Sequence, residues 1–186
     1  MNIQGKRILL RAIEEKDLET LHKWANDPKT QDMIGHLHFP SSMDFHKMWF
    51  QNLKNDQLNQ RFGIEAPEVG IVGISSLINI DWRNNHGWHG VMLGEENTRG
   101  KGYGVDAVMA TMRYAFEELH FERLDSAIIE YNSISLNFYC NKLGWKEEGR
   151  RRNYYFRKGK YWDQILIGIT REDYINQVKK TAYWDK

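Results

Sequence analysis

The chain has little of three features that would place it in a special class of protein. It has one cysteine, Cys140, which excludes a framework of internal disulfides. No run of residues approaches the ~18 apolar positions needed to cross a bilayer, and the first residues lack the apolar core of a signal peptide. The charges almost cancel, at +1, so long-range attraction to nucleic acid or to an anionic membrane is weak. We therefore expect a soluble cytoplasmic protein with neither a membrane nor a nucleic acid as its partner.

The spacing of apolar residues predicts helices and strands that alternate along the chain, without an internal repeat or a low-complexity linker. Helices are expected over residues 14–26, from Ser41-Ser42 to about residue 54, after Gly102 and after Asn132. Strands are expected over residues 7–11, 61–65, 70–80, 87–93 and 124–130, and in a last pair joined around Lys158-Gly159. Residues 29–40 show no clear period and are expected to form a surface loop. The length fits a single domain, residues 1–186.

A glycine-rich basic turn lies between an apolar run and a strongly periodic helix. It reads Arg99-Gly100-Lys101-Gly102-Tyr103-Gly104. Glycines let the backbone turn tightly and approach a ligand, the two cations supply charge, and the helix N-terminus adds unpaired amides. This combination predicts a site for a pyrophosphate. A P-loop is excluded because no Ser or Thr follows a Gly-Lys pair, and a Rossmann loop is excluded because the glycines are out of its register.

A second motif follows at a distance that one helix and one strand can span. It reads Asn132-Ser133-Ile134-Ser135-Leu136-Asn137-Phe138-Tyr139-Cys140-Asn141-Lys142-Leu143-Gly144-Trp145. In order and spacing, this segment and the Arg99-x-x-Gly102-x-Gly104 turn resemble the two motifs of the GCN5-related N-acetyltransferase (GNAT) superfamily. Cys140 stands where that family usually has Glu, and Trp145 where it has Phe. Downstream, Glu148-Gly149-Arg150 and Gly159-Lys160-Tyr161-Trp162-Asp163 resemble the branch that contains ribosomal-protein N-terminal and spermidine acetyltransferases.

The resemblance implies a mixed α/β fold of the GNAT type. Its central sheet is mostly antiparallel, is splayed at the cofactor site and has flanking helices. The implied cofactor is acetyl-CoA (coenzyme A), and the implied acceptor is a primary amine of a peptide N-terminus, an amino sugar or a small amine. By the same resemblance, the cofactor-binding residues are Met92, Leu93, Gly94, Arg99, Gly100, Lys101, Gly102, Tyr103, Gly104, Val105, Asn132, Asn137 and Tyr139. The first three would pair with the amides of the pantetheine arm.

Tyr139 stands at the family's general-acid position. A phenol with a pKa of about 10 can return a proton to a thiolate whose pKa is about 8.5. The amine has to lose a proton, and the sequence leaves the base open among Glu65, Asp81, His89, Glu95, Glu96 and water; histidine has the most suitable ordinary pKa. No metal is expected, because no Cys or paired acid completes a ligand set around His36-x-His38.

The acceptor pocket is implied to lie between residues 29–42 and residues 154–162. The first segment offers only Asp32, and the second is followed only by Asp163, so a strongly polycationic acceptor is not favoured. The resemblance also allows a homodimer, in which the tail over residues 174–186 takes part.

Two alternatives from other functional classes stay open. One is a non-catalytic sensor of acyl-CoA. The other is a nucleic-acid-binding module, because arginines and aromatic residues interleave in the last strand pair. Against the second, alternation along a hairpin would place the aromatic side chains on the core face and the arginines in solvent.

Overall fold

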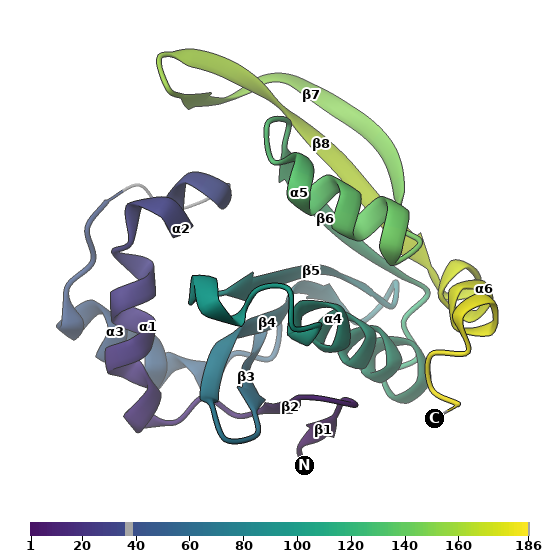
Figure 1. Cartoon of the computed structure of the whole chain (residues 1–186), viewed down its shortest axis with the longest axis horizontal. Helices are drawn as coiled ribbons and strands as arrows, with labels where there is room; N and C mark the ends of the chain where they lie inside the picture. The colour runs from purple at the N-terminus through teal and green to yellow at the C-terminus, as the bar shows by residue number, and fades with distance from the viewer. Residues whose placement is uncertain (36–38, 186) are drawn as a thin grey trace.

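The computed structural model describes residues 1–35 and 39–185 and, within them, every side chain except that of Glu96. One eight-stranded sheet has the strand order β1-β2-β3-β4-β5-β6-β8-β7 (Figure 1). Its strands are β1 (Ile3–Gln4), β2 (Leu9–Arg11), β3 (Gln60–Ala66), β4 (Gly70–Asp81), β5 (His86–Leu93), β6 (Arg123–Ile129), β7 (Lys146–Arg157) and β8 (Lys160–Thr170). Neighbouring strands are antiparallel, except that β5 and β6 are parallel. The expected mixed sheet, mostly antiparallel and flanked by helices, is confirmed.

The helices are α1 (Leu18–Ala25), α2 (Pro28–Met33), α3 (Met43–Leu53), α4 (Tyr103–Arg113), α5 (Ser133–Leu136) and α6 (Arg171–Thr181). Two of them continue in wider π-helical turns, α4 over Tyr114–Glu118 and α5 over Asn137–Lys142. The second of these turns carries Tyr139. π-helical turns occur often at functional sites.

Helices cover both faces of the central strands. Successive side chains of a strand point to opposite faces of the sheet. On β5, Met92 packs with Leu21 and Trp24 of α1. Val91, the residue before it, packs instead into the clusters that contain Ala107 and Val108 of α4. Helices α1 and α4 therefore cover opposite faces of β5.

Two helices were missed in the sequence. The expected loop over residues 29–40 begins with α2, whose N-terminus is capped by the Asp27 side chain through the amides of Lys29 and Thr30. Asp27-Pro28 ends one helix and begins the next, since Pro suits the first helical position. α6 has a capping box between Thr170 and Asp173, a local signal that could have been used.

β5 and β6 part from each other after a short stretch of pairing. Residues His86, Gly87 and Trp88 of β5 pair with Arg123, Leu124 and Asp125 of β6. Beyond Trp88, β5 stays paired with β4 alone, through to Leu93. Figure 1 shows the two strands diverging toward the end of β5 that leads to α4. The sheet is therefore splayed where the sequence predicts cofactor binding.

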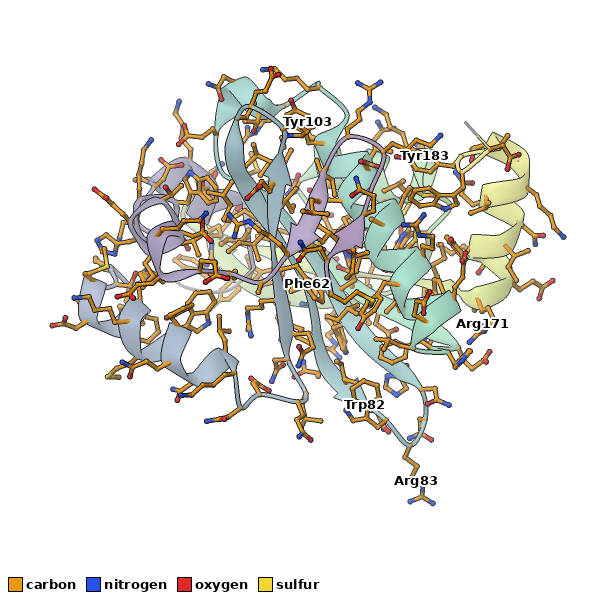
Figure 2. The ribbon with its side chains drawn as sticks, turned by 90° about the horizontal axis from the view of Figure 1, so that it is seen from below. Phe62, Trp82, Arg83, Tyr103, Arg171 and Tyr183 are labelled. Carbon is orange, nitrogen blue, oxygen red and sulfur yellow. The ribbon has the colours of Figure 1, made fainter. Side chains whose placement is uncertain are left out.

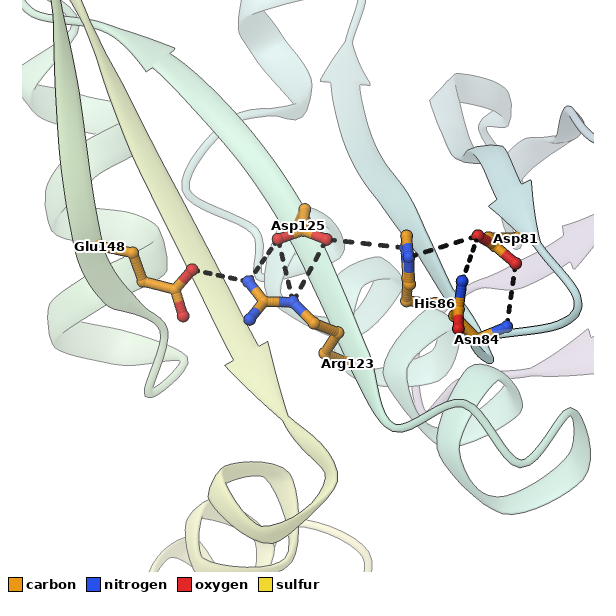
Figure 3. A network of polar contacts seen from close by, with 6 residues as sticks. All are labelled: Asp81, Asn84, His86, Arg123, Asp125 and Glu148. Atoms are coloured by element: carbon orange, nitrogen blue, oxygen red, sulfur yellow. Dashed lines mark hydrogen bonds and ion pairs between the residues drawn. The ribbon is translucent and has the colours of Figure 1, made fainter.

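A polar network holds the closed end of this splay (Figure 3). His86 lies between two carboxylates, with Nε2 at 3.8 Å from Asp81 and Nδ1 at 4.0 Å from Asp125. Arg123 pairs with Asp125 and, at 2.6 Å, with Glu148 of β7. Polar side chains from four strands thus meet where β5 and β6 still pair, and their contacts connect the strands at that end.

The two ends of the chain meet at the first turn of α4. The buried carboxylate of Asp106 accepts hydrogen bonds from the backbone amides of Lys6, Arg7 and Ile8 and from the hydroxyl of Tyr183, the last at 2.8 Å. Figure 2 shows Tyr183 beside the N-terminal strands. The aromatic side chains of the tail, Tyr183 and Trp184, pack within the chain, and the part of the tail in a homodimer stays a prediction.

Candidate active site

The glycine-rich turn forms the start of α4. Gly100 has φ +77° and Gly102 has φ +84°, in the left-handed region that favours glycine. Gly102 is the N-cap of α4, and its carbonyl accepts the first helical hydrogen bond, from Asp106 N at 3.0 Å. The amides of Tyr103, Gly104 and Val105 consequently have no partner inside the helix. Arg99 and Lys101 are exposed beside them. The structure thus brings the predicted cradle residues together at one helix N-terminus.

Arg7 supports this turn from the N-terminal segment. Its guanidinium donates to the carbonyl of Lys101 at 3.4 Å, and a Cβ added at Gly102 would lie 3.7 Å from Arg7 Cδ. The backbone amide of Arg7 donates to the Asp106 carboxylate, which fixes the backbone at Arg7. Arg7 was not predicted from the sequence, because no local pattern joins it to a turn 94 residues away.

The open edge of β5 follows from its pairing with β4. Gly94 N donates to the Val72 carbonyl at 3.0 Å, which places Gly94 in a hydrogen-bonded pair. Hydrogen-bonded and non-hydrogen-bonded pairs alternate along an antiparallel ladder. Met92 therefore faces β4, whereas Val91 and Leu93 direct their backbone groups to the side from which β6 has parted. Among the predicted residues Leu93 belongs to the open edge, and Val91 was missed.

Packing against Trp24, rather than contact with a cofactor, requires glycine at position 94. A Cβ at this position would lie 1.9 Å from the indole of Trp24. The indole packs directly on the backbone, and its Nε1 donates to Glu95 at 3.1 Å. Packing against α1 explains Gly94 without a cofactor, and its amide is already bonded to Val72. The structure therefore separates Gly94 from the cofactor-facing residues predicted beside it.

Tyr139 and His89 meet inside the core. The Tyr139 hydroxyl lies 3.1 Å from His89 Nδ1, and the two side chains are 5% and 3% exposed. Burial raises the pKa of Tyr139 and lowers the pKa of His89 to about 3. Both groups are therefore uncharged at neutral pH. His89 was considered as a base that faces the acceptor, but its burial and low pKa make it a poor one.

His89 also contacts two buried hydroxyls. Its Nε2 lies 3.4 Å from Ser75 Oγ, which lies 2.8 Å from Thr111 Oγ1. Thr111 in turn donates to the carbonyl of Ala107 at 2.8 Å, inside α4. Side chains from β4, β5, α4 and the turn after α5 thus form one chain of polar contacts.

The side chain of Asn132 is occupied on both sides. Its oxygen accepts from the amide of Ser135 at 3.0 Å and caps α5, as expected. Its nitrogen donates to the carbonyl of Met33 at 3.1 Å, at the end of α2. The amide thus holds two protein segments in the place of the predicted cofactor contact. Asn137 is exposed, and its oxygen accepts from Asn141 at 2.7 Å.

The other candidate bases are engaged elsewhere. Glu65 is paired with Arg11. Asp81 lies at the closed end of β5, away from the cradle, where its hydrogen bond from the Asn84 side chain lowers its pKa. Glu95 accepts from Lys23 at 2.8 Å, and that bond lowers its pKa. The side chain of Glu96 lies outside the described part of the structure.

The described residues contain no group of three or more His, Cys, Asp and Glu side chains arranged to hold a metal ion. His36 and His38 lie outside the described residues. None of the helices within the described ranges combines the length and apolar character that a membrane span requires.

The burial of His89 predicts a pH dependence of stability. Its pKa is about 3 in the folded chain against 6.5 ordinarily, so between these values the unfolded chain binds the extra proton. The free energy of unfolding should fall by about 1.4 kcal/mol per pH unit as pH drops below about 6.5. Urea denaturation of the wild type and of His89→Gln, followed by circular dichroism, measures this. The variant should lose that part of the slope; parallel curves would contradict the burial of an uncharged imidazole.

Comparisons with known proteins agree with this geometry. The family model described as acetyltransferase (GNAT) domain matches residues 7–146. The SPbeta prophage-derived uncharacterized N-acetyltransferase YokL of Bacillus subtilis (strain 168) is 31% identical over 172 residues, which cover 91% of this chain and 93% of that protein. The [ribosomal protein uS5]-alanine N-acetyltransferase of Escherichia coli (strain K12) is 27% identical over 115 residues, which cover 61% of this chain and 58% of that protein.

The fold has a similar solved structure. The spermidine N-acetyltransferase from Vibrio cholerae, in complex with CoA and spermine, superposes with a TM-score of 0.85 at 22% identity and covers 92% of this chain and 100% of that chain. At this identity the match concerns the fold. Together with the matched family model and the relative from Bacillus subtilis, it leads to one conclusion. The chain belongs to the GNAT acetyltransferase family and is an acetyl-CoA-dependent N-acetyltransferase.

Proposed function

We propose that this enzyme transfers the acetyl group of acetyl-CoA directly to a primary amine of a peptide N-terminus, an amino sugar or a small amine, with Tyr139 as general acid. One observation carries the proposal: a neutral, buried phenol lies on the helix next to the parted strands, with its hydroxyl held in a hydrogen bond of 3.1 Å to His89. Burial raises the pKa of Tyr139, so the proton is present when it is needed.

The residues around the splay fit coenzyme A. Val91 and Leu93 have unpaired backbone groups that suit the two amides of the pantetheine arm, which would lie along β5 in the manner of an added strand. The unpaired amides of Tyr103, Gly104 and Val105, with Arg99 and Lys101 beside them, suit the pyrophosphate. When bound, acetyl-CoA supplies a thioester carbon that an amine attacks.

Tyr139 then completes the transfer. As the new N–C bond forms and the C–S bond breaks, the hydroxyl gives its proton to the leaving sulfur, and the phenolate regains a proton from solvent. The protonated amine loses one proton before the attack, and the attacking nitrogen loses a second as the amide forms. Both protons go to solvent, because the described candidate carboxylates are engaged with Arg11, Asn84 and Lys23. Burial raises the pKa of Cys140, so its thiolate is scarce and no acyl-cysteine is proposed.

The acceptor side disfavours a polycation. Asp32 pairs with Lys158 at 2.7 Å, and Asp163 accepts from the backbone of Asn153 at 3.0 Å, so both carboxylates are already used. Spermidine is the acceptor in the name of the Vibrio cholerae relative, which is 22% identical to this chain. For this chain we propose an acceptor with a single amine.

Aromatic side chains of the last hairpin suit such an acceptor. Tyr154, Phe156 and Tyr161 are 50%, 57% and 60% exposed. The expectation that alternation places the hairpin aromatics on the core face is therefore wrong for these three, because the hairpin end extends beyond the rest of the sheet (Figure 1). Their exposed rings offer stacking surfaces for a sugar or a peptide. A homodimer stays a prediction; a spermidine N-acetyltransferase structure from Vibrio cholerae is described as dodecameric.

Replacing Tyr139 by Phe should lower kcat by about a hundredfold and leave the KM for acetyl-CoA nearly unchanged, because only proton donation is lost. Thiol release from acetyl-CoA, measured with N-terminal peptides, amino sugars, polyamines and aminoglycosides as acceptors, tests this and identifies the acceptor class. Equal losses in kcat and in acetyl-CoA affinity would contradict the role of Tyr139. Tight acetyl-CoA binding without turnover for any amine would favour the sensor alternative.

Replacing Gly102 by Val should weaken acetyl-CoA binding by at least about tenfold, measured by calorimetry, because φ +84° is unfavourable for Val and the cradle amides would shift. Gly159→Val is the matched control. Gly159 has φ +75° at the hairpin end, with nothing within 4 Å of an added Cβ. The control carries the same backbone strain away from the cradle and should bind normally. Equal binding by both variants would show that the turn does not hold the cofactor.

Replacing Lys158 by Gln should release Asp32 and improve the use of polyamines. An exposed ion pair contributes little, so the KM for spermidine should fall by no more than about fivefold, while the KM for a monoamine stays unchanged. Lys160→Gln, at the same hairpin, should have no effect, because Lys160 lies over Trp162 at 3.7 Å and not beside Asp32. The double variant K158Q/D32N should lose the gain. An unchanged preference would mean that Asp32 does not face the acceptor.

A further inference from the structure

We propose that His89 is a positioning residue for Tyr139: an uncharged imidazole that accepts the Tyr139 hydroxyl through Nδ1 and holds it ready for the cofactor. The proposal rests on the proposed function, in which Tyr139 donates a proton to sulfur. It assigns His89 a task other than that of a base, and it gives Ser75 and Thr111 a part in fixing the imidazole.

Nearly all of the surface of these four side chains is buried. His89 and Tyr139 are 3% and 5% exposed, and Ser75 and Thr111 are fully buried. The contacts run from Tyr139 to His89 Nδ1 at 3.1 Å, from His89 Nε2 to Ser75 at 3.4 Å and from Ser75 to Thr111 at 2.8 Å. The chain ends at the Ala107 carbonyl, 2.8 Å from Thr111.

The Ala107 carbonyl, at the end of this series of contacts, sets the direction of every hydrogen bond in the series. A carbonyl only accepts, so Thr111 donates its single hydroxyl proton to Ala107. Thr111 then accepts from Ser75, and Ser75 accepts from His89, which places the imidazole proton on Nε2. Nδ1 consequently has no proton and accepts from Tyr139. The opposite order would leave the contact between Thr111 and Ala107 without a proton, so this tautomer alone makes all four contacts hydrogen bonds.

The surroundings keep the imidazole neutral. The described contacts of His89 come from the hydroxyls of Ser75 and Tyr139 and from the rings of Tyr139 and Trp145, whose centroids lie 5.9 and 5.8 Å away. No carboxylate is among these contacts. A neutral acceptor binds the Tyr139 proton without removing it, and a bond accepted from the phenol stabilises the protonated phenol.

This arrangement suits a general acid. The Tyr139 hydroxyl rotates about its C–O bond, so its proton can turn from Nδ1 toward the sulfur of the bound thioester. The proton passes from oxygen to sulfur as the C–S bond breaks, and Tyr139 is reprotonated by solvent, so His89 exchanges no proton during the cycle. His89 contributes by fixing the position of the phenol oxygen, because even a small displacement of a reacting group lowers the reaction rate.

Replacement of His89 by Leu and by Asn tests the assignment. His89→Leu should lower kcat by about tenfold or more, with the KM for acetyl-CoA unchanged within about twofold. The amide oxygen of Asn can stand near the place of Nδ1, so His89→Asn should recover several-fold of the lost kcat. Ser75→Ala should also lower kcat, whereas Ser76→Ala, on the same strand, should not, because Ser76 bonds to the Gly90 carbonyl at 3.3 Å.

The tautomer provides a readout that does not depend on turnover. In ¹⁵N NMR of histidine-labelled wild-type protein, the His89 ring should show a protonated Nε2 and an unprotonated Nδ1 at every pH from about 5 to 8. A protonated Nδ1, a ring that titrates near its ordinary pKa of 6.5, or unchanged kcat in His89→Leu would each overturn the proposal. If Tyr139→Phe retains its kcat, the proposed acid itself fails, and that result is distinct from the failure of His89 alone.

Discussion

The parting of β5 from β6 is the constraint on which the rest of the structure depends. A sheet gains its order from backbone hydrogen bonds, and a strand edge left open in the interior has to find other partners or remain unsatisfied. Here the pairing lasts only from His86 to Trp88. The two strands therefore need a closure at the end where they still pair, and the edge of β5 beyond it is left open. Asp81, His86, Arg123, Asp125 and Glu148 provide the closure. The unpaired amides at the start of α4 follow the other end of β5 along the chain.

Tyr139 lies in the π-helical turn that continues the helix after β6. The turn is held at its start by Asn132 and packed along its side by Phe138, which would lie 3.6 Å from a Cβ on Gly104. Phe138 thus connects the turn that carries Tyr139 with the start of α4. This packing fixes the position of Tyr139, and the buried hydroxyls of Ser75 and Thr111 extend the support into β4 and α4.

The sequence predicted those features that local signals encode. Ser42 and Asn132 cap helices as expected, and the turn from Arg99 to Gly104 lies at the start of α4. The parted strands were available through the family resemblance, since no periodicity distinguishes a strand that loses its neighbour. Contacts between distant segments were not predictable. Arg7 supports a turn 94 residues away, and His89 meets a tyrosine 50 residues away. α2 was missed because a helix of six residues shows no apolar period.

Because the Asn132 side chain bonds to two segments of the chain, it bears on how the choice of acceptor can change during evolution. The Asn132 side chain holds both the helix that carries Tyr139 and the end of α2. The Tyr131 hydroxyl donates a further hydrogen bond to the carbonyl of Asp32, the residue before Met33. The segment between α2 and α3 therefore starts from an anchored point. Under the proposed function, substitutions at the end of α2 would change the acceptor side of the site, while Asn132 keeps the helix that carries Tyr139 in place.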